Sequence, residues 1–142
     1  MEGRTPVHLW IVGALATVWN AFGCFDYLMT QTRNAQYLAN FTDPQRIYFE
    51  SFPIWMEAVW ALGVWGGLAG SLLLLARSRH AVTAFAVSLA GLAVSTFYQY
   101  VLSSAPPEMS TPDMVAMNLA IWAVAIALLV YAMRMRRRGV LR

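Results

Sequence analysis

Four long apolar stretches, separated by shorter polar segments, make up most of the chain. They run from about residue 6 to 29, 53 to 76, 81 to 102 and 113 to 133. Because an α-helix rises about 1.5 Å per residue, each stretch can cross a hydrocarbon core of roughly 30 Å. The pattern therefore predicts a single all-α membrane domain over residues 1–142, a four-helix transmembrane bundle with up-down-up-down topology.

The first polar connection, residues 30–52, is long and rich in aromatic side chains. Thr42-Asp43-Pro44 is typical of a helix start, with Thr42 or Asp43 as the cap and Pro44 in the first turn. Aromatic rings favour the boundary between lipid and water. We therefore expect one or two short helices that lie in the interface, rings toward the lipid. The aromatic residues of this segment are Tyr37, Phe41, Tyr48, Phe49 and Phe52.

Arginines are distributed unevenly between the two sides of this predicted bundle. One side holds only Arg33 and Arg46. The other side holds Arg4, Arg77, Arg79, Arg134, Arg136, Arg137, Arg138 and Arg142. Short loops rich in arginine and lysine stay in the cytoplasm. The count therefore predicts that both termini are cytoplasmic and that the connection over residues 30–52 lies outside.

Composition argues against several classes of function. Only 12% of the residues are charged, against about a quarter in soluble domains. The net charge of +3 comes from arginines beside apolar segments, so membrane orientation explains it better than nucleic-acid binding. The single cysteine, Cys24, excludes a CxxC motif and is expected to be a small core residue.

Enzymatic and metal chemistry also find no support in the sequence. His8 and His80 are predicted near the arginine-rich side without a third ligand beside them, so no metal site is expected. Catalytic triads, phosphate-binding glycine loops and HExxH are absent from the sequence. We therefore expect neither an enzyme nor a cofactor.

Polar side chains recur at the outer level of the predicted spans. Asp26 comes about one turn before the first span ends, Glu57 one turn after the second begins, and Gln99 at the end of the third. Asn20 lies nearly two turns deeper than Asp26. A carboxylate at mid-membrane costs roughly 2.5–3.5 kcal/mol, and less near an interface. The dipole at a helix C-terminus also disfavours a negative charge, so Asp26 needs a partner.

The candidate partners of Asp26 are Arg33, Arg46, a tyrosine hydroxyl, a proton or a ligand. Tryptophans lie within a turn or two of the polar groups, and the sequence thus predicts a shallow polar cavity that opens outward. Such a cavity could take a sugar face, a lipid headgroup or a quinone ring. Its predicted ligand-binding residues are Asp26, Glu57, Gln99, Asn20, Trp19, Trp55 and Trp60.

A structural interpretation of the same residues stays open. Charged and aromatic side chains ordinarily gather at the ends of membrane helices. Glu57, in a first turn, meets the positive end of its own helix dipole, and Asn20 can bond across helices. The overlapping pairs Gly63/Gly67 and Gly66/Gly70 favour close helix contacts, within the chain or in a dimer.

Four segments carry a resemblance to known sequences. They are TPVHLW at 5–10, WNAFG at 19–23, DYLMTQTR at 26–33 and STFYQ at 95–99. With these segments the whole chain resembles a group of small proteobacterial inner-membrane proteins with four helices, whose members often carry the name "sugar transporter". The helix count is also similar to that of DoxX-like membrane proteins. The resemblance implies a location in the bacterial inner membrane and supplies no catalytic or binding residues.

Two functional hypotheses follow from these observations. The first is a non-enzymatic inner-membrane protein that binds a small polar or amphipathic ligand, or a lipid headgroup, in the outer cavity, as part of a transporter if it dimerises. The second is an accessory or assembly subunit of a larger membrane complex. A quinone-linked redox enzyme ranks last, because the sequence lacks paired cysteines and a histidine pair within one span. Membrane lipids are the expected partners in either case.

Overall fold

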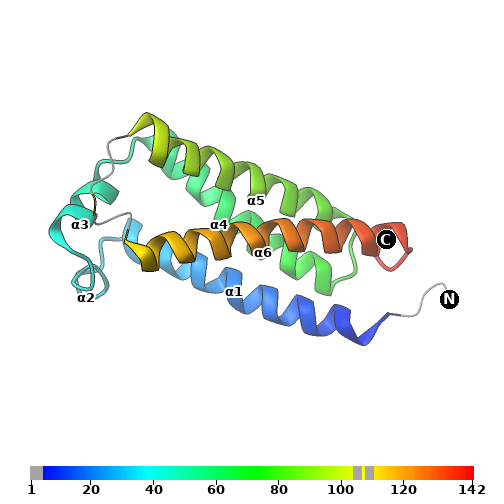
Figure 1. Ribbon diagram of the computed structural model, residues 1–142. Helices are drawn as coiled ribbons and strands as arrows, with labels where there is room; N and C mark the ends of the chain where they lie inside the picture. Colours follow the sequence, from blue (N-terminus) through cyan, green and yellow to red (C-terminus); the bar gives the residue numbers. More distant parts are fainter. Residues whose placement is uncertain (1–4, 104–106, 108–110) are drawn as a thin grey trace.

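The four long helices of the chain lie side by side and alternate in direction (Figure 1). The computed structural model describes residues 5–103, 107 and 111–142, so Arg4 and most of the third connection lie outside the described residues. The long helices are α1 (Val7–Gln31), α4 (Ile54–Leu75), α5 (His80–Phe97) and α6 (Pro112–Arg137), and α5 continues as a π-helical turn η1 (Tyr98–Leu102). The predicted all-α fold is confirmed over the described residues.

Two short helices fill the first connection, as the sequence predicts. They are α2 (Ala35–Leu38) and α3 (Asp43–Glu50). Thr42 is the N-cap of α3, and its side chain accepts a hydrogen bond from the backbone N–H of Gln45. The Gln45 side chain accepts one from the backbone N–H of Thr42 in return, which completes a capping box. The end of the bundle that carries α2 and α3 is called the α2–α3 end below.

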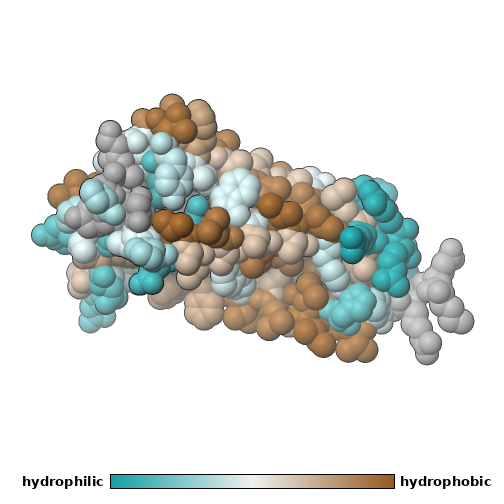
Figure 2. Space-filling view, in the orientation of Figure 1, coloured by the Kyte–Doolittle hydropathy of each residue, from teal (hydrophilic) through white to brown (hydrophobic). Residues whose placement is uncertain are grey.

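Each long helix, with η1 included in the third, is long and apolar enough to cross a membrane. Large apolar side chains such as Leu15, Phe22 and Leu119 point outward, each about two-thirds exposed. In Figure 2 hydrophobic residues cover the length of the visible face, and hydrophilic residues gather at its two ends. A soluble protein would bury such a surface, whereas lipid solvates it. The chain is therefore a multi-pass membrane protein.

Two helices run beyond the predicted spans. α1 continues to Gln31, two residues past the expected end, and α6 continues to Arg137 rather than ending near residue 133. Arginine is a good helix former, and cations in a last turn interact favourably with the helix dipole. The arginines that follow the apolar stretch therefore extend α6 beyond it.

Glycines bring α4 and α5 into close contact. A methyl group on Gly91 of α5 would lie 2.8 Å from the backbone nitrogen of Gly63 and 2.9 Å from the carbonyl oxygen of Val59, both on α4. On the same helix, Gly66 faces Ala84 and Ser88, and Gly70 faces Phe85. Both predicted glycine pairs therefore mark contacts, and these contacts lie within one chain.

The most buried part of the core lies at the opposite end, called the arginine-rich end. After α6 the chain reverses at Gly139, whose φ of 76° suits glycine. The backbone N–H of Val140 donates to the carbonyl of Met135, and that of Gly139 to Arg136, which is a Schellman motif. The cluster that this turn completes includes Leu9, Leu74, Phe85, Ala132, Met135, Val140 and Leu141.

Candidate functional site

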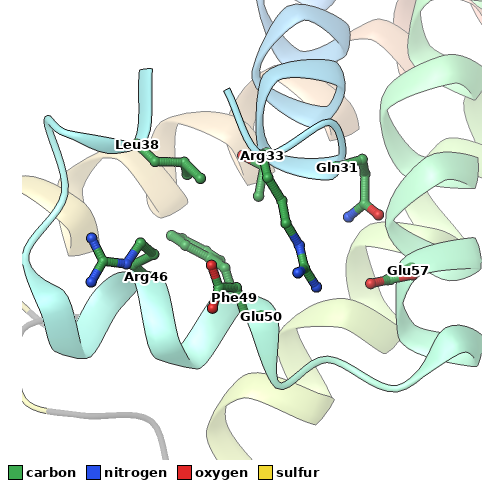
Figure 3. Close-up of a pocket in the computed structure, with 8 residues that line it drawn as sticks. Gln31, Arg33, Leu38, Arg46, Phe49, Glu50 and Glu57 are labelled. Carbon is green, nitrogen blue, oxygen red and sulfur yellow. The ribbon is translucent and has the colours of Figure 1, made fainter. Parts of the chain in front are cut away.

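A polar cavity of about 360 Å³ lies at the α2–α3 end. The end of α1, both short helices and the first turn of α4 enclose it, and Figure 3 shows their side chains around it. Its lining residues are Thr30, Gln31, Arg33, Leu38, Arg46, Phe49, Glu50 and Glu57. The two arginines and two glutamates make this a site with both signs of charge and a balanced total.

Arg33 occupies a backbone position that normally belongs to glycine. It follows the last turn of α1 with a φ of 55°, and the backbone N–H groups of Arg33 and Asn34 bond to the carbonyls of Thr30 and Met29. This is a Schellman motif with arginine in the left-handed position. The conformation costs a non-glycine residue about 1–2 kcal/mol. The residue in this strained conformation is therefore one whose side chain lines the cavity.

The two arginines and two glutamates of the cavity form no ion pairs with one another. Figure 3 shows the Arg33 side chain extending into the space between Glu50 and Glu57. Among the described residues, ion-pair distance is reached only by Arg46 and Asp43, at 2.8 Å between Nη2 and Oδ1. The Glu57 carboxylate, in the first turn of α4, lies where the helix dipole stabilises it. The cavity therefore presents donors and acceptors that a ligand can use.

Aromatic packing holds α3 in place beside the cavity. The rings of Phe49 and Trp60 stack with an interplanar angle of 22°, and Phe52 packs edge-on against Trp60. The hydroxyl of Tyr48 bonds to the Ser103 hydroxyl at 2.6 Å, which ties α3 to the end of η1. Trp60, a predicted stacking residue, thus supports the wall of the cavity from behind.

Asp26 is not among the residues that line the cavity; its partner is a tyrosine hydroxyl from α2. Tyr37 donates a hydrogen bond to the Asp26 carboxylate, and its ring packs edge-on against Phe25. A tyrosine hydroxyl is one of the partners that the sequence predicts. Burial, together with the bond to Asp26, raises the pKa of Tyr37 above its ordinary value. The pair fastens α2 to the last turns of α1.

Replacing Tyr37 by phenylalanine is expected to loosen α2. A half-buried carboxylate would lose its donor, at a cost of about 1–3 kcal/mol. Amide hydrogen exchange over residues 34–41 measures the effect, and Tyr100→Phe, at an exposed tyrosine, is the matched control. In the wild type this contribution is complete below the ordinary tyrosine pKa and is lost as the pH rises through the raised value. Unchanged protection in Tyr37→Phe would show that α2 is held by other contacts.

Asn20 serves the contact between α1 and α4. Its Nδ2 donates to the Ser71 hydroxyl at 3.1 Å and to the carbonyl of Ala16 at 2.8 Å, and a side chain on Gly67 would collide with it. Ser88 of α5 donates to the carbonyl of Gly63 at 2.6 Å. These contacts satisfy the polar groups in the middle of the bundle, which favours the structural interpretation of Asn20.

The remaining predicted residues lie on other surfaces. Trp19 and Trp55 are 36% and 47% exposed on the outside of their helices, and Trp55 packs edge-on against Tyr98. Gln99 lies half-buried in η1. π-Helical turns often accompany functional sites, but Gln99 does not line the cavity.

The structure places most of the predicted ligand-binding residues outside the cavity. Of the seven predicted ligand-binding residues, Glu57 lines the cavity, whereas Asp26 bonds to α2, Asn20 bonds to α4 and Gln99 lies in η1. The reason is that α2 and α3 fold over the end of the bundle and supply half of the lining residues themselves. Arg33, Arg46 and Glu50 were visible as charges in the connection, but their spacing does not reveal that they share a space.

Comparison with known proteins finds no matching family model, no similar curated protein and no similar solved structure.

Proposed function

We propose that this is a bacterial inner-membrane protein that binds a small polar or amphipathic ligand, or a lipid headgroup, at the α2–α3 end. The observation that carries the proposal is the arrangement of Arg33, Glu50 and Glu57 around one cavity without ion pairs between them. Arg33 and Glu50 are exposed and Glu57 is half-buried, so their guanidinium and carboxylate groups are accessible to a ligand that carries groups of both signs.

The left-handed backbone at Arg33 supports the same proposal. Glycine would fit that position without strain, and strained residues cluster at functional sites. A guanidinium there suits an anionic or carbonyl group of the ligand, and the two carboxylates suit an ammonium or hydroxyl group. A ligand with both kinds of group, such as a zwitterionic headgroup or a polyhydroxylated compound, fits this mixture of charges best.

The topology completes the proposal. With both termini in the cytoplasm, as the arginine distribution predicts, the cavity faces the outer side of the membrane. It lies at headgroup level, where an amphipathic ligand can enter from the lipid. Transport would need a path through the bundle, and the Asn20–Ser71 bond occupies the middle of the α1–α4 contact. Binding is therefore the activity we assign, and any role in transport would require a partner.

Paired substitutions test this function. Arg33→Gly removes the guanidinium and relieves the left-handed backbone, so stability should stay constant or rise by up to about 1 kcal/mol. Arg77→Gly is the control for the backbone change, since Arg77 has a φ of 59° after α4 at the opposite end. It also removes the hydrogen bond from Arg77 Nε to the carbonyl of Val140, so its thermal stability is measured alongside. Native mass spectrometry of protein extracted in gentle detergent measures the retained small molecule.

We expect wild type and Arg77→Gly to retain the same small molecule. Arg33→Gly should retain at least about tenfold less of it, because one charge-assisted hydrogen bond to the ligand is lost. Glu57→Gln should show a similar loss, with Asp113→Asn at the exposed start of α6 as its control. Equal retention by Arg33→Gly and wild type would contradict a binding role for the cavity.

One observation favours the second hypothesis, an accessory subunit of a larger complex. α6 packs mainly against α5, and only 6% of its most apolar 18-residue segment is buried, against 22% of the corresponding segment in each of the other three long helices. A helix with so little contact within its own chain can offer a face to a partner protein. The same native mass measurement separates the two: a persistent larger complex without a small molecule favours the subunit.

A further inference from the structure

A second pocket, of about 480 Å³, lies at the arginine-rich end between the start of α1 and the end of α6. It is unrelated to the cavity beneath α2 and α3. Its lining residues are His8, Tyr131, Arg134, Met135, Arg137 and Arg138. Each of these residues except His8 comes from α6 or the residue after it.

The geometry of α6 gathers the positive charges on one side of the helix. Arg134, Arg137 and Arg138 follow one another at three- and four-residue spacing, which places them on one helical face. All three are exposed, so their guanidinium groups are available to a ligand. Arg136, in contrast, is not part of the pocket.

A polar contact between helices forms the inner wall. The Tyr131 hydroxyl and His8 Nδ1 share a hydrogen bond, and the two rings meet edge to face at 5.6 Å between centroids. This contact joins α1 to α6, which otherwise packs mainly on α5. The pocket is therefore built from two helices rather than being a bare run of arginines.

The described residues around the pocket supply no negative charge. None of its lining residues is an aspartate or glutamate, and the carbonyls of Arg134, Met135 and Arg136 already accept backbone hydrogen bonds in the turn at Gly139. Three guanidinium groups thus face one space with no anion of the protein beside them. Their fork-shaped donors match phosphate oxygens, to which arginine binds in bidentate fashion.

We propose that this pocket binds the phosphate of an anionic phospholipid, such as phosphatidylglycerol, in the leaflet at the arginine-rich end. The pocket lies where the apolar surface of α6 gives way to arginines, which is the level of lipid phosphates. Met135, which is buried in the core, closes the inner side of the pocket. General attraction to an anionic membrane surface stabilises binding by about 1 kcal/mol for each nearby arginine, whatever its position. A specific pocket instead predicts that only the arginines lining it contribute strongly to lipid binding.

Matched pairs of arginines test the proposal. Arg134→Gln with Arg138→Gln removes two charges from the pocket, and Arg136→Gln with Arg79→Gln removes two charges from the same end outside it. Native mass spectrometry measures the lipid retained from mixed micelles that contain either phosphatidylglycerol or phosphatidylcholine. Inorganic phosphate, added separately, distinguishes a free phosphate from a lipid.

We expect wild type and the Arg136/Arg79 variant to retain phosphatidylglycerol in preference to phosphatidylcholine, and the Arg134/Arg138 variant to lose that retention by about tenfold or more. Equal loss in both double variants would overturn the pocket in favour of general attraction to a charged surface. Displacement of phosphatidylglycerol by millimolar inorganic phosphate would overturn the assignment to a lipid. Since all four arginines are exposed, thermal unfolding in neutral detergent should be unchanged in both variants.

Discussion

Gly91→Ala is expected to destabilise the helix bundle by about 1–3 kcal/mol, the usual cost of forcing an extra group into a packed interface. The added methyl group would lie 2.8 Å from the Gly63 nitrogen and 2.9 Å from the Val59 carbonyl oxygen. Both are backbone atoms that cannot turn aside, so α4 and α5 must separate. Close backbone approach is the main source of attraction between helices in lipid, and its loss should be felt along the whole contact.

Gly63→Ala is the matched control for this prediction. Its methyl group would meet its nearest neighbour, the Leu92 nitrogen, at 3.7 Å, an ordinary contact in the same interface. Both substitutions gain helix propensity, so the difference between them isolates the clash. Unfolding in mixed micelles of sodium dodecyl sulfate measures both stabilities. If the two variants proved equally stable, the close approach of α4 to α5 would be wrong.

Leu74→Ala is expected to cost about 2–4 kcal/mol, because Leu74 is fully buried in the core at the arginine-rich end. It packs in the cluster that includes Leu9, Phe85 and Leu141. In a membrane the unfolded helices remain in lipid, so the loss comes from packing contacts and the cavity left behind rather than from transfer to water.

Leu72→Ala tests the same helix two residues away. Leu72 is 51% exposed, and lipid can fill the space that its side chain leaves. We expect a change within about 0.5 kcal/mol. The same detergent titration compares the two variants. A larger loss from Leu72→Ala than from Leu74→Ala would mean that α4 is rotated relative to the structure.

The contrast between Leu72 and Leu74 also shows which features of the fold the sequence could predict and which it could not. The lengths of the apolar stretches predicted the four long helices, and Thr42-Asp43-Pro44 predicted the start of α3. The rotation of α4 could not be predicted, because leucines occupy positions 72 to 75 and so face every direction. In lipid, hydrophobicity alone does not separate the buried face of a helix from the exposed one.

The candidate site was predicted less well than the fold. The sequence identified Glu57 and the need of Asp26 for a partner, since charges within apolar stretches stand out. It did not identify Arg33 as a lining residue, because its position depends on a left-handed turn that glycine usually forms. The spacing of residues also could not reveal that α3 folds back over the bundle. That position of α3 depends on the stacking of Phe49 on Trp60, a tertiary contact that no local sequence pattern indicates.

An experimental structure of the protein in lipid nanodiscs, prepared without added ligand, tests the central claim most directly. We expect non-protein density in the cavity, within hydrogen-bonding distance of both Arg33 and a carboxylate of Glu50 or Glu57. A cavity closed by a direct ion pair between Arg33 and Glu57, with no density between them, would contradict it.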